Sequence, residues 1–296
     1  MNMRWNIGRL VLVAFLGATS LSGCWGSSSN STTLTLAAAD TPVDGAERVV
    51  IAFKGVQIQG MTGALLEHAY SAPRQIDLLQ LQDDNFALLL NSLDVPPGSY
   101  QGIRLLVDMS QSYIILSDGS MHSLVIPSGL DQTELPLASG FSIAPDEQAA
   151  FAVDFDLRKS ITLNSGTYDF VPAMRLVDVN RSGALEGFVS TSFTIGGLAI
   201  SDPTCQPAAY IYAGSGTTPV DINPTSAVQP LQTANVFLDI ARGAYHYGSE
   251  YLPPGNYTVA LVCAAGDDPR IVDSLNFSAP KSAAVTAAQH AEVDYP

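Results

Sequence analysis

The sequence predicts an all-β fold with two β-sandwich-like domains, residues 34–181 and 182–296, and one short helix in the first domain. Several segments alternate apolar and polar residues with a period of two, which is the pattern of half-buried strands. Each predicted domain also contains one Pro-Pro-Gly turn in front of such a segment. With 47% hydrophobic and 14% charged residues, the 296-residue chain can bury substantial cores instead of remaining disordered.

The first residues have the features of an export signal. Arg4 and Arg9 accompany an apolar run over residues 10–21, which is too short to span a bilayer because a spanning helix needs roughly 20 residues. The run ends in Leu21-Ser22-Gly23-Cys24, which resembles the lipobox of bacterial lipoproteins. The resemblance implies that residues 1–23 are removed and that Cys24 is lipidated through its nucleophilic thiolate. The alternative is cleavage elsewhere, with Cys24 an ordinary thiol.

The predicted anchor also suggests a location. Each buried methylene contributes about 0.8 kcal/mol, so two or three acyl chains on Cys24 would hold the protein on a membrane lastingly. In Gram-negative lipoproteins an Asp after this cysteine favours the inner membrane, and here the residue is Trp25. We therefore expect a lipid-anchored protein of the cell envelope, in the outer membrane of a Gram-negative bacterium. Residues 24–33, polar from Gly26 to Thr33, are expected to form a flexible tether.

The net charge excludes one class of partner. The formal charge is −15, and removal of Arg4 and Arg9 with the signal changes it to −17. A surface this acidic repels phosphate backbones, so we expect no nucleic acid partner.

Three segments show the clearest alternation and are predicted strands. Their apolar residues are Val49, Ile51 and Phe53; Ile103, Leu105 and Val107; and Phe151, Val153, Phe155 and Leu157. A hairpin is predicted where Asp118-Gly119 separates the runs 113–116 and 121–126, because Gly tolerates the positive φ of a tight turn. The short helix is predicted over residues 84–92, where three apolar side chains (Phe86, Leu89 and Leu90) have helical spacing.

The two Pro-Pro-Gly turns have the same context. Val95-Pro96-Pro97-Gly98-Ser99-Tyr100 and Leu252-Pro253-Pro254-Gly255-Asn256-Tyr257 both lead from a stiff turn into a strand that opens on tyrosine. The two domains are thus predicted to use the same entry into a strand.

Residues 40–178 resemble the bacterial domain of unknown function known as DUF4382. The resemblance rests on ordered matches along the chain: residues 40–46 with 49–56, 76–79, 97–105, 126–129, 153–156 and 172–176. It implies an envelope lipoprotein with a β-rich fold, and no catalytic residue is carried over from it.

The chain from about Ala184 resembles a carboxypeptidase-regulatory-like or transthyretin-like β-sandwich. The segments that carry the resemblance are 185–189, 208–213, 252–262 and a final strand near 291–295. Such modules serve as rigid spacers or binding surfaces. The Ala-rich residues 283–291 are predicted as strand, with helix as the alternative on propensity.

Two cysteines remain besides Cys24. Thiols of an exported chain meet an oxidising compartment, so Cys205 and Cys263 are predicted to form a disulfide. The alternative is a pair of buried free thiols.

One loop has part of a calcium-binding pattern. Asp178, Asn180 and Ser182 occupy the first, third and fifth places, but the twelfth place is Val189 instead of a bidentate carboxylate. The alternative is a polar turn between the domains. Asp154 and Asp156 are predicted to form a solvated strand face, although with further ligands they could bind a cation.

No catalytic constellation is visible in the sequence. The four histidines (His68, His122, His246 and His290) lie outside zinc-type motifs, and Gly214-Ser215-Gly216 lacks the spacing of a nucleophile elbow. We therefore expect no enzyme and no cofactor. Paired carboxylates for glycoside chemistry, distant in sequence, remain an open alternative.

A group of tyrosines supplies the candidate ligand-binding residues. They are Tyr210, Tyr212, Tyr245, Tyr247 and Tyr251. On one exposed patch they could stack on sugar rings or pack against a protein. The alternative is that they belong to the core and the sheet faces.

These features favour a membrane-anchored, noncatalytic cell-envelope lipoprotein that acts as a structural or protein-interaction module. Its expected partners are the membrane and an envelope protein or glycan. The alternative is a carbohydrate-binding or hydrolytic lipoprotein, which would need a deep pocket with facing carboxylates and tyrosines.

Overall fold

The computed structural model describes residues 31–296 except 42–44, 82–84, 224 and 266. The predicted signal peptide, Cys24 and most of the predicted tether lie outside the described residues. Within these residues the fold is nearly all β, as the sequence predicts, and the single α-helix is α1 (Leu157–Ser160). No helix there is long and apolar enough to cross a membrane.

Two sheets, which we call the N-terminal sheets, are formed by residues 33–178. The smaller consists of β13 (Met174–Asp178), β10 (Gln148–Asp156), β1 (Thr33–Thr41) and β4 (Ala87–Asp94), in this order. The larger has the order β11 (Ile161–Asn164), β12 (Thr167–Phe170), β7 (Met121–Val125), β6 (Tyr113–Leu116), β2 (Ala46–Gly60), β5 (Gly98–Val107) and β8 (Glu134–Leu137). In addition, β3 (Leu65–Asp77) pairs with β2, and β9 (Phe141–Ile143) pairs with β5.

The core of the N-terminal sheets contains every apolar side chain named above for the three predicted alternating segments. The rings of Phe53 and Phe155, from the larger and the smaller sheet, meet edge to face with centroids 6.3 Å apart. The predicted hairpin is also confirmed, since β6 and β7 pair across a turn in which Gly119 has a φ of 82°. Two 3-10 turns, η1 (Leu78–Gln80) and η2 (Met109–Gln111), complete this part.

The helix predicted over residues 84–92 is wrong. Residues 87–94 form strand β4, which pairs with β1, and residues 82–84 lie outside the described part. The register shifts between Leu36 and Ala37 of β1, so consecutive residues Leu89 and Leu90 are both buried. This irregularity gives the strand an apolar spacing that imitates a helix, and pairing with a distant strand overrides the local preference.

Two further sheets, the C-terminal sheets, are formed by residues 183–292 and pack around a separate core. One has the order β19 (Phe237–Asp239), β20 (Ala244–Leu252), β14 (Gly183–Val189) and β23 (His290–Glu292). The other has the order β18 (Gln232–Asn235), β17 (Pro207–Ala213), β21 (Gly255–Cys263) and β22 (Lys281–Val285). A small hairpin consists of β15 (Thr194–Ile195) and β16 (Leu198–Ala199). The Ala-rich residues 283–291 are strand at both ends, and no helix forms between them.

The two Pro-Pro-Gly turns fold alike, as the sequence predicts. The hydroxyl of Tyr257, at the start of β21, donates to the carbonyl of Pro253 at 2.6 Å. Tyr100, at the start of β5, donates in the same way to the carbonyl of Pro96. In each copy the tyrosine reaches back four residues and fixes the turn against the strand that follows it, as in the tyrosine corner of β-sandwiches.

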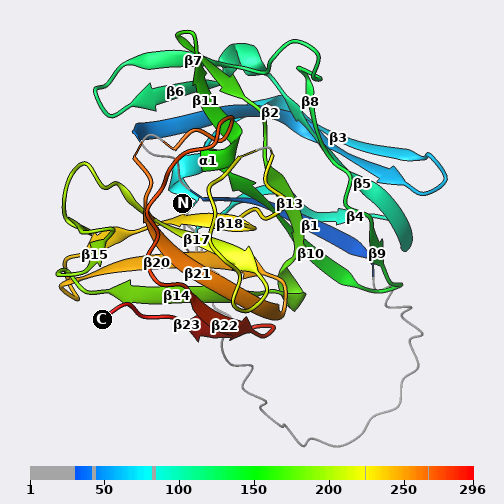
Figure 1. Cartoon of the computed structure of the whole chain (residues 1–296). Helices are drawn as coiled ribbons and strands as arrows, with labels where there is room; N and C mark the ends of the chain where they lie inside the picture. The colour runs from blue at the N-terminus through cyan, green and yellow to red at the C-terminus, as the bar shows by residue number, and fades with distance from the viewer. Residues whose placement is uncertain (1–30, 42–44, 82–84, 224, 266) are drawn as a thin grey trace, which may run out of the picture.

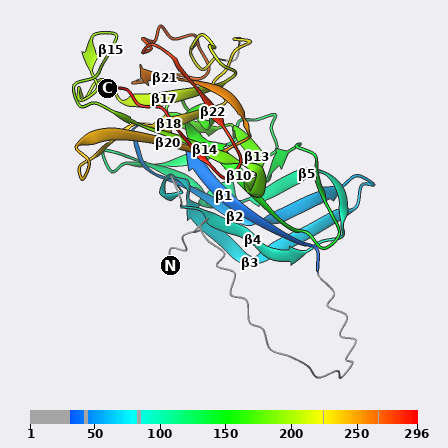
Figure 2. The same ribbon diagram turned by 90° about the horizontal axis from the view of Figure 1, so that it is seen from below.

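A buried polar network joins the N-terminal sheets to the C-terminal sheets, which lie side by side in Figures 1 and 2. Asp154 of β10 accepts hydrogen bonds from Arg175 Nε at 3.1 Å and from Gln232 Nε2 of β18 at 3.3 Å. Ser249 of β20 donates to Gln232 Oε1 at 2.6 Å. Because Asp154 is 3% exposed and Asp156 6% exposed, the predicted solvated face is wrong. The C-terminal sheets cover that side of β10.

Helix α1 extends this network. It begins after Asp156, whose carboxylate accepts a hydrogen bond from the backbone N–H of Lys159 at 3.2 Å and forms an ion pair with its Nζ at 3.0 Å. Thr233 of β18 donates to the same carboxylate at 3.1 Å. Lys159 also donates to the carbonyl of Pro230 at 2.6 Å, so the ammonium group of this helix residue contacts the segment before β18.

Candidate functional site

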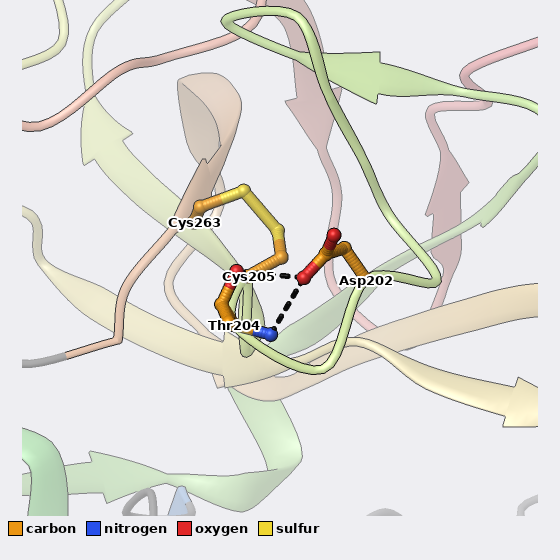
Figure 3. The surroundings of a disulfide bond; sticks show 4 residues. All are labelled: Asp202, Thr204, Cys205 and Cys263. Atoms are coloured by element: carbon orange, nitrogen blue, oxygen red, sulfur yellow. Dashed lines mark hydrogen bonds between the residues drawn. A yellow bond between two sulfur atoms is a disulfide. The ribbon is translucent and has the colours of Figure 1, made fainter.

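The predicted disulfide is present in the C-terminal sheets. It joins Cys205, in the loop before β17, to Cys263 at the end of β21 (Figure 3). The turn before Cys205 is fixed by Asp202, whose carboxylate accepts hydrogen bonds from the backbone N–H and the hydroxyl of Thr204 at 2.8 and 2.6 Å. The bond thus connects this turn to the strand at the centre of its sheet.

The tyrosines do not gather on one exposed patch, and the alternative that they belong to the core and the sheet faces holds for at least three of the five. Tyr210, Tyr212 and Tyr247 are fully buried. Tyr247 donates to the carbonyl of Val293 at 2.6 Å, which ties β20 to the end of the chain. Tyr245 is half-buried against the core of the C-terminal sheets. The alternation of inward and outward residues along each strand places these rings inside.

The partial calcium pattern forms a 3-10 turn, η3 (Val179–Arg181), between the two pairs of sheets. The carboxylate of Asp178 accepts a hydrogen bond from the backbone N–H of Asn180 at 3.0 Å and lies 3.4 Å from Arg181 Nε. The hydroxyl of Ser182 donates to the carbonyl of Val179 at 3.1 Å. These oxygens are engaged within the turn, which is the arrangement expected of the polar-turn alternative.

Two of the scattered histidines meet Glu186, which holds the ninth place of the partial calcium pattern. His246 Nε2 lies 3.3 Å from one carboxylate oxygen of Glu186, and His290 Nδ1 lies 3.6 Å from the other. The three residues come from β20, β14 and β23, which are adjacent in one sheet. No spacing in the sequence could reveal this group, because it depends on the pairing of distant strands.

Glu186 and His246 belong to a surface that we call the outer face, which also includes Phe188, Phe237 and Arg242. The register places Phe188 opposite His246 and His246 opposite Phe237. The ring of His246 lies 4.9 Å from that of Phe188 and 5.4 Å from that of Phe237. The guanidinium of Arg242 lies 4.4 Å from the centre of the Phe188 ring, in cation–π contact.

Apolar side chains border the outer face at β19, an edge strand of its sheet. Phe237 and Leu238 of β19 are 42% and 47% exposed, and Ile240, directly after the strand, is 85% exposed. An edge strand offers unpaired backbone groups, and exposed apolar side chains next to it are typical of interaction sites. The alternation in residues 185–189 could have indicated an outward Phe188, whereas nothing in the sequence indicates the exposure of Ile240.

Acidic side chains lie at one side of the same surface. Glu292 is paired in register with Glu186, and its pKa is raised by a hydrogen bond with Asp294 and by the negative charges of Asp294 and Glu186. Asp294 in turn accepts a hydrogen bond from the backbone N–H of Phe188 at 2.7 Å. The outer face is therefore aromatic at its centre and acidic at one side.

A cavity of about 390 Å³ lies at the other end of this sheet, beside η3. Its lining includes Asn180, Glu250, Tyr251 and His290. Tyr251 has a φ of 58°, in the left-handed region that non-glycine residues seldom adopt, so its position there is strained. The described lining has one carboxylate, that of Glu250, and not the facing pair that glycoside hydrolysis requires.

Comparison with solved structures gives only distant similarities. A candidate cell adhesion protein of Bacteroides fragilis is 8% identical with a TM-score of 0.22, and the match covers 89% of this chain and 92% of that chain. A candidate adhesin of Bacteroides ovatus is 11% identical with a TM-score of 0.21, covering 94% and 99%. The minor pilin of Streptococcus agalactiae is 11% identical with a TM-score of 0.19, covering 88% and 93%.

Comparison with curated proteins gave no match. The resemblance of the C-terminal sheets to carboxypeptidase-regulatory-like or transthyretin-like sandwiches stays a prediction. In the N-terminal part, residues 31–172 match the family described as "Domain of unknown function (DUF4382)". The match agrees with the resemblance predicted for residues 40–178, and the chain therefore contains a DUF4382 domain.

Proposed function

We propose that this protein is a noncatalytic cell-envelope lipoprotein, anchored through Cys24, that binds a protein partner on the outer face. Residues 1–23 would be its signal peptide and residues 24–33 its tether, so that the two β domains, 34–181 and 182–296, stand away from the membrane. The lipid chains would supply the attachment, and the outer face would supply the recognition.

The observation that carries this proposal is the exposed apolar border of the outer face. Phe237 and Leu238 of the edge strand β19, and Ile240 directly after it, are all more than two-fifths exposed, next to a group of aromatic rings in edge-to-face and tilted contact. Aromatic residues and arginine contribute strongly to protein interfaces, and this surface contains two phenylalanines and Arg242. Burying Ile240 against a partner would contribute roughly 1.5–3 kcal/mol.

The charge around the outer face indicates the chemistry of the partner. Glu186, Glu292 and Asp294 lie together, and a hydrogen bond with Asp294 and the negative charges of Asp294 and Glu186 raise the pKa of Glu292. A partner surface with apolar side chains beside lysines or arginines would complement this arrangement. After removal of residues 1–23 the formal charge would be −17, which would speed the approach of a basic partner.

Site-specific photocrosslinking in the native envelope tests the interaction. We expect a crosslinker at position 240 to capture one protein, and Phe237→Ser with Ile240→Ser to reduce its yield at least tenfold. The matched control is Met121→Ser with Leu130→Ser, since these apolar residues are 63% and 49% exposed on the N-terminal sheets. Equal yields from both double variants would contradict the proposal, as would capture of glycan alone.

The anchor requires a separate test. We expect mass spectrometry of the mature protein to find an N-terminal Cys24 bearing acyl chains, and Cys24→Ser to release the protein from the membrane fraction. A mature protein that begins elsewhere and carries no lipid would overturn the anchor, without bearing on the outer face.

The cavity beside η3 favours one second candidate, a glycan-binding function. Its volume of about 390 Å³ is within the range of ligand pockets, and Tyr251 and His290 supply rings for stacking. Glycan-array binding that is lost in Tyr251→Ala but kept in Ile240→Ser would favour this function over the protein partner.

A further inference from the structure

Three aspartates from two loops meet beside the sheet that contains β17 and β21. Asp221 lies in the loop after β17, whereas Asp267 and Asp273 lie in the loop after β21. One carboxylate oxygen of each residue is within 4.8 Å of the corresponding oxygens of the other two. Ligand oxygens lie 2.3–2.6 Å from a calcium ion, so two ligands of one ion are at most about 5 Å apart. The three carboxylates thus have the spacing of a shared cation site.

Asp221 provides the second observation, because one of its oxygens is buried without a partner. The residue is 5% exposed. Its Oδ2 accepts a hydrogen bond from the backbone N–H of Asp273 at 2.6 Å, whereas Oδ1 has no hydrogen-bond partner in the described part of the chain. Burying a carboxylate oxygen without a compensating interaction is unfavourable, and a cation is one group that compensates it.

The negative charge of the cluster also favours a bound cation. The three carboxylate oxygens lie within 4.8 Å of one another, so their negative charges repel. Within the ranges that the structure describes, neither Asp221 nor Asp273 forms a salt bridge with a basic side chain. A divalent cation would neutralise this group and would remove the repulsion between its members.

Two buried tyrosines of β17 hold the loops in place. Tyr210 donates a hydrogen bond to the carboxylate of Asp267. The hydroxyl of Tyr212 donates to the carbonyl of Val220 at 2.5 Å and accepts from its backbone N–H at 3.2 Å, immediately before Asp221. Both rings belong to a small apolar cluster with Ile222. The tyrosines therefore bring the aspartates together independently of any ion.

We propose that Asp221, Asp267 and Asp273 bind one calcium ion, which joins the loops after β17 and β21. All three ligands are carboxylate oxygens, the hard donors that calcium and magnesium prefer over softer metals. Calcium is the better match, because it tolerates irregular coordination, whereas magnesium demands a near-octahedral set at 2.0–2.1 Å. The site lies outside the predicted calcium loop at Asp178 and is independent of the proposed protein partner.

Calorimetric titration of the EDTA-dialysed, detergent-solubilised protein with CaCl₂ tests the site. We expect one calcium ion per chain, and a rise in Tm of about 5 °C at a concentration 100 times the Kd. Asp221→Asn and the less buried Asp273→Asn should each weaken binding at least tenfold. The control is Asp94→Asn, which makes the same charge change at an exposed residue of β4 and should leave binding unchanged.

A readout in EDTA separates a ligand from a purely structural residue. If Asp221 is a ligand, Asp221→Asn relieves repulsion in the metal-free protein, and its Tm in EDTA is at least that of the wild type. A lower Tm for this variant both in EDTA and in CaCl₂, by equal amounts, would overturn the proposal. Absence of calcium binding to the wild type, or binding of magnesium alone, would also overturn it.

Discussion

Arg175 of β13 lies between Asp154 of β10 and Gln232 of β18, and a single guanidinium nitrogen contacts both. Its Nη2 is 2.5 Å from Asp154 Oδ2 and 2.9 Å from Gln232 Oε1. Gln232 also donates to Asp154 Oδ1 at 3.3 Å, which closes the triangle. The junction between the N-terminal and C-terminal sheets is thus built on charge-assisted hydrogen bonds, whose geometry is specific in a way that apolar contact is not.

Arg175→Met should destabilise the protein by about 3 kcal/mol, because it leaves the buried carboxylate of Asp154 without its cation. Urea unfolding measures the change. The control is Arg181→Met, whose ion pair with Asp178 is 80% exposed on the arginine side and should contribute less than about 1 kcal/mol. The double variant Arg175→Met, Asp154→Leu should recover part of the loss, and equal losses in all three variants would contradict this account.

The buried carboxylate of Asp154 should make the unfolding free energy depend on pH. Burial raises its pKa to about 6 although Arg175 opposes the shift, so the folded state binds the proton more tightly than the unfolded state. The group therefore contributes stability at pH 4 that is lost as the pH rises through 6, by up to about 3 kcal/mol. Unfolding free energies at pH 4 and 7 should show that the destabilisation by Asp154→Asn is smaller at pH 7. A larger destabilisation at pH 7 would mean that the ion pair outweighs burial.

The strands themselves could be predicted from the sequence wherever one face is buried. Val49, Ile51 and Phe53 have a period of two because the larger sheet faces a core, and the structure buries all three completely. The same rule gave the wrong result for Asp154, which alternates with buried residues but is itself covered by Gln232 from a distant strand. Alternation shows which side chains lie on the same face of a sheet, but it does not show whether a distant segment covers that face.

The candidate sites were less predictable, since each depends on contacts between distant segments. The pair Cys205 and Cys263 could be predicted because only two cysteines remain after Cys24. Asp221 and Asp273 are 52 residues apart and lie in no motif, and only the two loops bring them together. The sequence makes Tyr212 a candidate for ring stacking on a ligand, whereas in the structure its hydroxyl bonds to the Val220 backbone inside the protein.

Removal of the disulfide should weaken the C-terminal sheets. The bond joins residues separated by 58 positions, and a loop of that length corresponds to about 4 kcal/mol on the chain-entropy model. We expect the double variant Cys205→Ala, Cys263→Ala to lower the unfolding free energy by roughly this amount. Reduced wild-type protein should show a similar loss, and an unchanged urea midpoint after reduction would contradict the prediction.

Gly187→Ala should disrupt the pairing of β14 with the end of the chain. A Cβ atom at this position would overlap the carbonyl oxygen of Val293 and lie 2.8 Å from the hydroxyl of Tyr247. Because both neighbours are held by backbone pairing and a buried hydrogen bond, we expect a loss of about 3 kcal/mol in urea unfolding. Gly140→Ala is the control, since its nearest neighbour would be 3.4 Å away, and an equal effect of both changes would oppose this reasoning.

The repeated tyrosine turn can be tested in both copies by deletion of a single oxygen. In Tyr257→Phe and in Tyr100→Phe the ring stays in place, but the carbonyl of Pro253 or Pro96 loses its donor. Each change should cost about 1–2 kcal/mol in urea unfolding, because a partly buried carbonyl is left without its hydrogen bond. Tyr245→Phe is the matched control, since this half-buried tyrosine makes no side-chain hydrogen bond to the described residues, and the change should alter stability by less than about 0.5 kcal/mol. If the two turns act alike, the two losses should be equal within about 0.5 kcal/mol. The losses should also add in the double variant, since the tyrosines belong to separate cores. A loss in only one copy would show that the shared sequence does not produce a shared energetic role.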